Sequence, residues 1–520
     1  MSQQPAVDPE SVRAAEIIAA ACLATDLGMG FPFEHGLHGT LMAMRLADLL
    51  AVDAETASQT YYASLLMYSG CMTDAHIATR IFQGSRTEHL TPKQFGSARE
   101  SLGGVIRSLP DPEAAGLGRA AQIAGRLVVA ARFRKPHFAA LCEVAEMMAE
   151  RLGLPPAVHG LFAYLTERWD GKGILRRGRE GEIPLPIRIV QVARDAAYQR
   201  VLGGEQRALA MTRERAGHAF DPDVATRFVE HAPEVFGAVD EAASSWEATL
   251  EAEPRPHLTL EDGAIDRALA AMGDFADLGS PHLAGHSRGV ADLAASAARL
   301  CGFDGQEVVQ IRRAAMVHDL GRTAIDPRIW QKADALSVDE WEQVRLHPYH
   351  TERVLVRSPA LAPLADVACS HHERLDGGGY HRRAAAASLT GGARLLAAAD
   401  AFHAMCEPRP HRPPLQPDRA AEVLGQEARA ARLDSRMVAA VIEAAGQPPP
   451  PVERPAGLTE REVEVLGLLA RGLQTKQVAR RLGISNKTAD RHIQNAYRKI
   501  GISTRAAATL FAMEHGLVPR

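Results

Sequence analysis

The 520-residue sequence has few cysteines and few aromatic residues. Its six cysteines lie far apart without a CxxC pair, which argues against a disulfide framework or a thiolate zinc site and fits a reducing compartment. Aromatic residues make up 5% of the chain, and the runs of Val, Ile and Thr that mark strands are missing. Because alanine is abundant instead, we predict an all-α fold.

The sequence also lacks a long apolar segment near its N-terminus. The first residues are polar, and Glu16 and Asp26 interrupt the apolar stretch that follows. We therefore expect neither a signal peptide nor a membrane span, and we predict a soluble, cytoplasmic protein.

Charge is spread unevenly along the chain. The net charge is −4, but residues 456–520 hold 11 Lys/Arg against 5 Asp/Glu, whereas the rest of the chain carries a net −10. A basic module on an acidic body suits a domain that meets phosphates while the body stays off nucleic acid. A proline-rich stretch at 447–455 precedes this module and predicts an extended linker.

The body contains an internal repeat. Residues 167–173 (ERWDGKG) resemble 373–379 (ERLDGGG) at an offset of 206, and His35 and Leu66-Met67-Tyr68-Ser69 correspond to His286 and Met316-Val317-His318-Asp319. The first copy has Tyr68-Ser69, Leu165-Thr166 and Arg194 where the second has His318-Asp319, His371-His372 and Asp400. The first copy has thus lost the groups that could hold a metal.

In the second copy, ionisable residues follow apolar runs. His318-Asp319 comes after Ala314–Val317, and Asp400 comes after Leu395–Ala399, both of which predict buried helices. Because a buried carboxylate is costly unless it is paired or bound to a cation, these positions predict a metal site. Nitrogen ligands for it are available at His286, His318, His347, His371 and His372. Imidazole and carboxylate without thiolate suit iron, manganese, zinc or related divalent metals, and the ligands do not choose among them.

This ordered set resembles the HD-GYP family of HD phosphohydrolases. The matching motifs are His286-Ser287, His318-Asp319-Leu320-Gly321, His347-Pro348, His371-His372-Glu373, Asp376-Gly377-Gly378-Gly379-Tyr380 and Asp400. The resemblance implies a helical domain with two or three divalent metal ions that hydrolyses cyclic di-GMP or a related cyclic dinucleotide. It also implies that seven residues ligate metal: His286, His318, Asp319, His347, His371, His372 and Asp400.

The sequence departs from the family at two positions, with Arg322 where the family usually has Lys and His381 where it has Pro. Arg322, Arg409 and Arg412 are candidates for binding substrate phosphates. The resemblance predicts a degenerate HD-GYP-like domain at 1–250, which we call the first segment. It predicts a metal-binding HD-GYP-like domain at 255–446, which we call the second segment.

The basic module at residues 456–520 is predicted to form a four-helix domain. Thr459 and Glu462 have the spacing of a capping box, which predicts a helix from about residue 460. Gly472 ends that helix, and Thr475 is predicted to cap a second helix that runs to Leu482. Two more helices are predicted from Lys487 to Ile500 and from Thr504 to His515.

This module closely resembles the LuxR-type helix-turn-helix over residues 456–520, through Leu458-Thr459, Arg461-Glu462, Thr488, His492, Lys499-Ile500-Gly501 and Thr504-Arg505-Ala506. The resemblance places the third helix in the major groove of double-stranded DNA. The candidate DNA-contacting residues are Thr475, Lys476, Lys487, Thr488, Arg491, His492, Asn495, Lys499 and Arg505.

Together these features predict a DNA-binding transcriptional regulator coupled to a metal-dependent phosphodiesterase domain, acting as a homodimer because one such head reads a short half-site. Two alternatives remain at this point. The second segment could be a non-catalytic sensor that controls the DNA-binding head, or the protein could be a phosphodiesterase whose tail only localises it.

Overall fold

The computed structural model describes residues 11–72, 75–83, 94–448, 455–515 and 517. Most of the proline-rich stretch, residues 449–454, lies outside the described residues. By their contacts the described residues group into two units. The first contains the described residues up to Arg288 with 316–365 and 410–412, and the second contains 289–315, 366–409 and the described residues from Pro413 onward.

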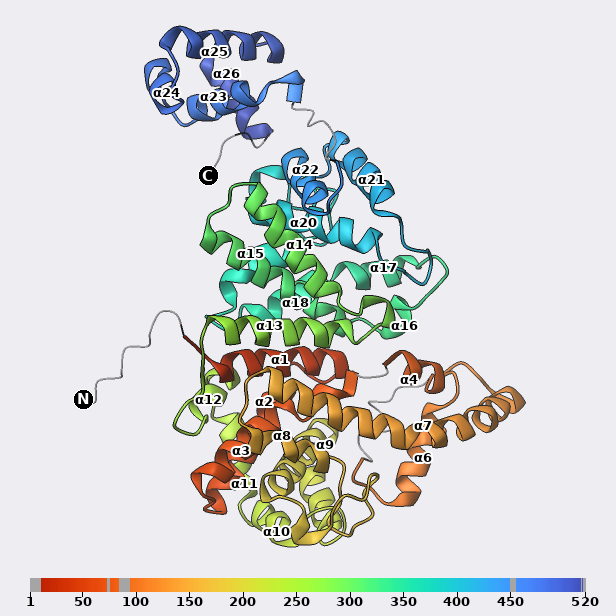
Figure 1. The fold of residues 1–520 in the computed structure, drawn as a ribbon. Coiled ribbons are helices and arrows are strands. Elements are labelled where there is room, and N and C mark those ends of the chain that lie inside the picture. The colour runs from red at the N-terminus through yellow and green to blue at the C-terminus, as the bar shows by residue number, and fades with distance from the viewer. Residues whose placement is uncertain (1–10, 73–74, 84–93, 449–454, 516, 518–520) are drawn as a thin grey trace, which may run out of the picture. The chain divides into compact units, whose positions relative to one another are not determined.

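Both units are built from helices, as predicted (Figure 1). The helices of the first unit are α1 (Ala14–Met29), α2 (His35–Leu49), α3 (Ala54–Leu66), α4 (Ala75–Ile81), α6 (Ala98–Ser108), α7 (Gly116–Arg151), α8 (Pro156–His159), α9 (Leu185–Arg215), α10 (Pro222–Glu230), α11 (Ala232–Asp240), α12 (Ser245–Glu251), α13 (Asp262–Asp277), α16 (Pro327–Trp330), α17 (Val338–Arg345) and α18 (His347–Leu355). The only strands in the described part of the chain are β1 (Val12–Arg13) and β2 (Thr259–Leu260), which pair antiparallel.

The second unit holds α20 (Gly391–Met405), α21 (Pro417–Arg429), α22 (Ser435–Ala444), α23 (Glu460–Ala470), α24 (Thr475–Arg481), α25 (Asn486–Ile500) and α26 (Arg505–Glu514). The chain passes from one unit to the other within α14 (His286–Leu300), α15 (Gly305–Val317) and α19 (Ala365–Cys369). Short 3-10 helices connect the others: η1 (Ser69–Met72), η3 (Gly160–Tyr164), η4 (Glu180–Glu182), η5 (Pro281–Leu283), η6 (Leu320–Ala324), η7 (Ala362–Leu364), η8 (Ala386–Ser388) and η9 (Pro455–Gly457).

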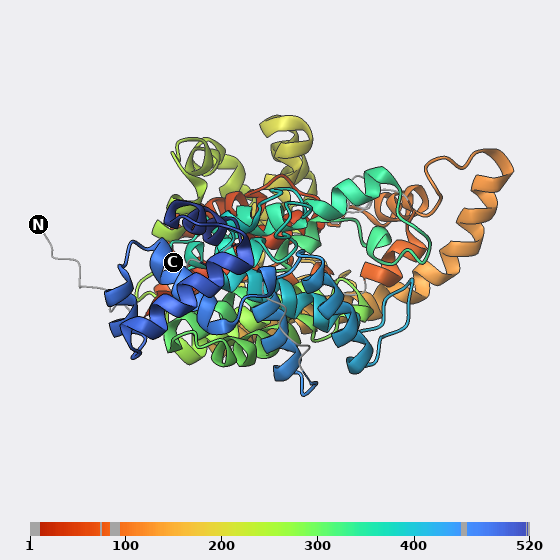
Figure 2. The same cartoon turned by 90° about the horizontal axis from the view of Figure 1, so that it is seen from above.

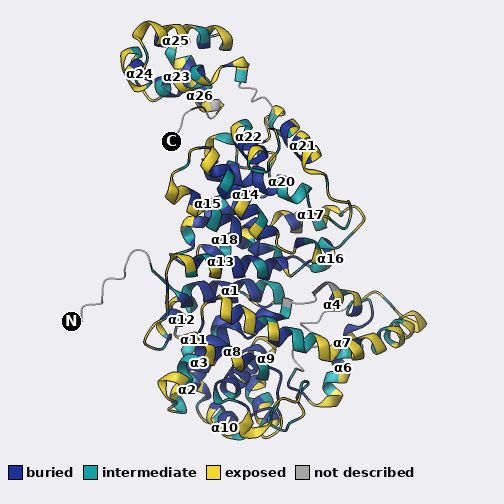
Figure 3. Cartoon of the chain, viewed as in Figure 1, coloured by how far each residue is buried: buried dark blue, intermediate teal, exposed yellow. Residues whose placement is uncertain are grey.

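Helix α1 is the core element of the first unit. Its residues from Ala14 to Asp26 are almost all buried, and Figure 3 shows it in the colour of buried residues over most of its length. It packs against α2 and α3, and also against η6 and α18. The start of α7, where Leu117 is 91% exposed, reaches away from these helices (Figures 1 and 2).

Features of the predicted repeat recur in the structure. Asp26 accepts hydrogen bonds from the amide of Gly36, next to His35, and Asp277 accepts them from the amide and hydroxyl of Ser287, next to His286. Likewise, Gly171 and Gly377 both adopt positive φ, at 70° and 74°. Each of these pairs keeps the sequence offset expected for its part of the repeat.

The C-terminal helices begin and end within about one residue of the predicted positions. The capping box forms, since Thr459 Oγ1 accepts from the amide of Glu462 while the Glu462 carboxylate accepts from the amide of Thr459. One detail differs: Gln474 is the N-cap of α24 and Thr475 its first helical residue. A buried cluster that includes Val465, Leu466 and Ile493 forms the core of these four helices.

Candidate metal centre and DNA interface

Three histidine side chains lie around the buried carboxylate of Asp319. It follows α15 by two residues and is 2% exposed. The Nε2 atoms of His286 and His318 lie 3.6 Å from its Oδ2, and Nε2 of His347 lies 3.3 Å from its Oδ1. All three histidines are buried. Buried carboxylate oxygens beside several imidazole nitrogens are a donor set that suits a divalent transition metal.

Backbone carbonyls orient two of the histidines. Nδ1 of His347 lies 2.6 Å from the carbonyl oxygen of Val344, and Nδ1 of His371 lies 2.6 Å from that of Ala368. A hydrogen bond donated by Nδ1 fixes the tautomer in which Nε2 carries the lone pair, which is the usual arrangement of a metal-binding histidine. The start of α14, and with it His286, is held by Asp277, whose pKa burial raises to about 6.

A second set of donors comes from the loop after α19 and from the middle of α20. Nδ1 of His372 lies 3.7 Å from Oδ2 of Asp400, which is buried within α20. The ring of Tyr380 packs against His372 with the centroids 4.3 Å apart. Glu373 holds the segment that follows Tyr380 by accepting hydrogen bonds from the amides of Arg382 and Ala384.

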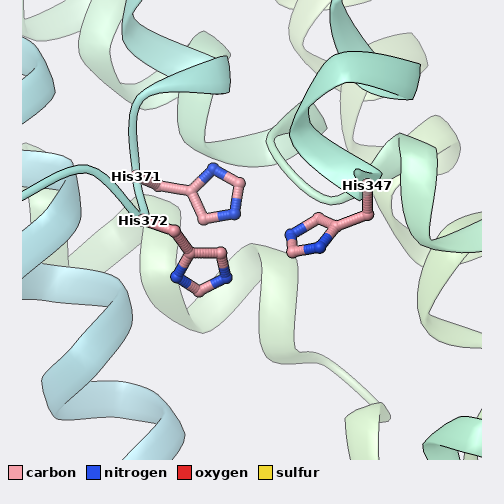
Figure 4. Close-up of side chains that lie close together, drawn as sticks. All are labelled: His347, His371 and His372. Atoms are coloured by element: carbon pink, nitrogen blue, oxygen red, sulfur yellow. The ribbon is translucent and has the colours of Figure 1, made fainter. Parts of the chain in front are cut away.

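Four groups of three side chains have ligand atoms within 4.8 Å of one another: His347, His371 and His372 (Figure 4); His318, Asp319 and His371; His286, His318 and Asp400; and His286, His403 and Glu407. These groups include all seven residues that the sequence predicted as ligands. They also include His403 and Glu407, which no motif in the sequence marks as ligands. The chain therefore has candidate metal-binding clusters of histidine and carboxylate.

Two of the three arginines predicted to bind phosphate donate hydrogen bonds to acidic side chains. Arg322 Nη1 donates to Oδ2 of Asp319 at 2.9 Å, and its guanidinium lies 3.9 Å from the centre of the Trp330 ring. Arg409 Nη2 donates to Glu407 at 2.9 Å, while Arg412 is half-buried. The guanidinium of Arg322 thus lies beside the carboxylate at the middle of the first donor set.

The positions of the first segment that the sequence repeat pairs with these ligands are filled differently. The guanidinium of Arg194 is buried and lies 3.1 Å from the centre of the Tyr68 ring. Ser69 donates to the carbonyl of Leu66. None of the four groups of candidate ligands lies in the described part of residues 11–250. The first segment therefore has the positively charged side chain of Arg194 at the position that the repeat pairs with Asp400.

In the C-terminal helices, several predicted DNA contacts are exposed. Lys476, Lys487, Thr488 and Arg491 lie at the surface of α24 and α25, and Ser485 caps α25 by accepting from the amide of Thr488. Thr475, His492 and Asn495 are half-buried, and Asn495 accepts a hydrogen bond from Arg498.

Two of the predicted phosphate contacts are occupied within the domain. Lys499 Nζ donates to Glu462 at 2.7 Å and to the carbonyl of Gly457 at 2.9 Å. Arg505 Nη2 donates to the carbonyls of Leu469 and Leu473 at 2.7 and 2.9 Å. These bonds favour a structural role for both residues over a phosphate contact, and only the tertiary structure reveals them.

Comparison with known families agrees with this architecture. The HD domain family matches residues 271–437, and the family of bacterial regulatory proteins of the luxR type matches residues 456–512. The chain thus joins an HD domain to a LuxR-type helix-turn-helix. Within the described residues, no helix combines the length and the apolar character that crossing a membrane requires.

Individual relatives are similar to different parts of the chain. A 3'3'-cGAMP-specific phosphodiesterase 3 of Vibrio cholerae is 26% identical over 416 residues, which is 79% of this chain and 90% of that protein. A cyclic di-GMP phosphodiesterase of Thermotoga maritima is 35% identical over 131 residues, covering 25% of this chain and 36% of that protein. The nitrate/nitrite response regulator NarP of Escherichia coli is 50% identical over 60 residues, or 11% of this chain and 28% of that protein.

Among solved structures, a crystal structure of a cyclic GMP-AMP specific phosphodiesterase of V. cholerae covers 84% of this chain and 99% of its own, with a TM-score of 0.57 and 24% identity. This likeness concerns the fold and extends over both the first and the second segment.

Proposed function

We propose that this protein is a DNA-binding transcriptional regulator whose second segment is a metal-dependent phosphodiesterase for a cyclic dinucleotide. The observation that carries the proposal is the presence of all seven predicted ligands in the candidate metal-binding groups. The phosphodiesterase relatives support the substrate class, because two of them act by name on 3'3'-cGAMP or cyclic di-GMP. We further propose the boundaries 1–250, 255–446 and 456–520 for the three domains.

The donor set fits two divalent ions such as iron or manganese. Because Nδ1 of both His347 and His371 faces a carbonyl oxygen, each ring can present Nε2 as a ligand. Asp319 offers two carboxylate oxygens to different partners, a geometry suited to bridging. When bound, metal ions at such a site lower the pKa of a coordinated water and polarise phosphodiester oxygens.

The protein's own side chains would position the substrate. Arg322 carries its charge next to Asp319, and its planar guanidinium can bind a phosphate by two parallel hydrogen bonds. Tyr380, packed on His372, presents an aromatic face beside the candidate ligands. Stacking of a base on such a ring is tolerant of base identity, so it suits a dinucleotide ligand.

The decisive test of this proposal combines metal analysis with turnover of 3'3'-cGAMP and cyclic di-GMP by the purified chain. We expect bound metal and a linear dinucleotide product from the wild type, and loss of both in Asp319→Ala. The matched control is Asp292→Ala, because the Asp292 side chain on α14 is 70% exposed. Metal binding without any cleaved product would refute catalysis and favour the sensor alternative.

For the DNA-binding head, we expect Arg491→Ala to weaken binding by about 1–3 kcal/mol if Arg491 reads a base. Genomic footprinting of the wild type and the variant measures this. Arg419→Ala removes an exposed charge outside the head and serves as control. Unchanged occupancy in Arg491→Ala would refute the role of α25 as the recognition helix. Homodimer formation, also proposed, would place two heads on paired half-sites.

A further inference from the structure

Helix α20 carries a histidine, His403, on the same face as Asp400. His403 follows Asp400 by three residues, a spacing that brings the two side chains to within about 60° around the helix axis. His403 and Glu407, which lies two residues beyond the end of α20, are both half-buried. Neither residue belongs to the ligand set that the family resemblance implies.

The imidazole of His403 has a carboxylate beside one of its nitrogens. Nδ1 lies 3.2 Å from Oε1 of Glu407, whose other oxygen accepts a hydrogen bond from Arg409 at 2.9 Å. At this distance the carboxylate favours a proton on Nδ1 by its charge, although Nδ1 does not make a hydrogen bond in this structure. Carboxylates that hold the Nδ1 proton of a histidine are common behind metal-binding imidazoles, because they fix the ring and raise the basicity of Nε2.

The other nitrogen of His403 points at α14. A Cβ atom at Gly289 would lie 2.0 Å from Nε2 of His403, so only glycine leaves room for the ring there. Gly289 follows His286 by three residues and therefore shares its helix face. Consistently, the ligand atoms of His286, His403 and Glu407 lie within 4.8 Å of one another.

We propose that His403 is an additional metal ligand that, with His286, creates a cation position beyond those of the seven-residue set. Glu407 and Arg409 orient the ring, and Gly289 makes space for it. Imidazole ligands of this kind suit a divalent transition metal such as iron, manganese or zinc. This inference rests on the proposed metal centre of the second segment and adds one position to it.

The test is a titration of the chelated full-length protein with Co²⁺, followed by visible absorption and by metal analysis per chain. We expect His403→Ala to bind one Co²⁺ fewer than the wild type. Gly289→Ala should do the same, because its methyl group displaces the ring. Glu407→Gln should keep the full number but weaken the affinity of that one ion about 10–100-fold. His257→Ala changes an exposed histidine elsewhere and should match the wild type.

Circular dichroism establishes that each variant is folded before its metal content is compared. If folded His403→Ala binds as many ions as the wild type with the same affinities, the inference is wrong. In that case Asp319→Ala tests the proposed function separately. Loss of metal from this variant would support the proposed seven-residue centre even though His403 is not a ligand. A wild-type protein that binds no Co²⁺ at all would overturn both.

Discussion

Asp26 is a buried carboxylate on α1 that holds the start of α2. Both of its oxygens accept from the amide of Gly36, and it lies near the start of α2 that carries His35. Burial raises the pKa of Asp26 to about 8, partly offset by the Gly36 hydrogen bond and by Arg194. Burial, with the nearby Arg194, lowers the pKa of His35 to about 3. Both groups are therefore largely neutral at pH 7 in the folded protein.

The stability of the first segment should consequently fall as pH rises from about 6.5 to about 8. An acid with a raised pKa in the folded state contributes stability at low pH, and this contribution is lost as pH rises toward the folded pKa. His35 acts in the opposite direction, but only below about 6.5, where the unfolded state takes up a proton. Asp26→Asn should flatten the decline, by at most about 2 kcal/mol over this window.

Urea unfolding of the wild type and Asp26→Asn at several pH values checks this prediction. Glu55→Gln, at an exposed position of α3, is a suitable control. Parallel pH dependences for the wild type and Asp26→Asn would show that the Asp26 carboxyl has no raised pKa in the folded protein.

Helix α25 separates residues that face solvent from residues that hold the domain together. Lys487 is exposed near its start, whereas Lys499 near its end bonds to Glu462 of α23. We expect Lys487→Ala to lower the slope of log affinity for DNA against log salt by about 1, as for the loss of one phosphate contact. Arg505→Ala should instead leave that slope unchanged and lower the melting temperature, because it strips the hydrogen bonds from the carbonyls of Leu469 and Leu473.

Fluorescence anisotropy with labelled DNA over a range of salt concentrations measures the slope, and thermal unfolding measures the stability. A reduced salt slope in Arg505→Ala without loss of stability would restore Arg505 as a phosphate contact.

Features that depend on neighbouring residues in the sequence were predictable, whereas contacts between residues far apart in the sequence were not. The ends of α23 and α25 follow from Thr459, Ser485 and Gly501, whose capping acts within one turn, so sequence predicted them closely. The candidate histidine and aspartate ligands were chosen from the order of short motifs, and the structure brings their side chains together in groups. The contacts of Lys499 and His403 were not predictable, because each depends on a residue that only folding brings near: Glu462 for Lys499 and Gly289 for His403.

At the scale of the whole molecule, the first and second segments differ in the origin of their buried positive charge. Arg194 is part of the chain and stacks on Tyr68, so the first segment carries this positive charge without taking up an ion, although burial lowers the pKa of the guanidinium. The second segment is proposed to obtain its cations from solution. A ligand that binds only the folded state stabilises it by about 4 kcal/mol at a thousand times its dissociation constant.

Removal of metal should therefore loosen one segment and spare the other. We expect a chelator to speed amide hydrogen exchange in α14 and α20, which carry His286 and Asp400, while α9 around Arg194 keeps its protection. Mass spectrometry of peptides from the full-length chain measures both segments in one sample, and Asp319→Ala should already exchange fast without chelator. Equal acceleration in α9 would mean that the first segment also depends on a metal ion, and that Arg194 does not replace one.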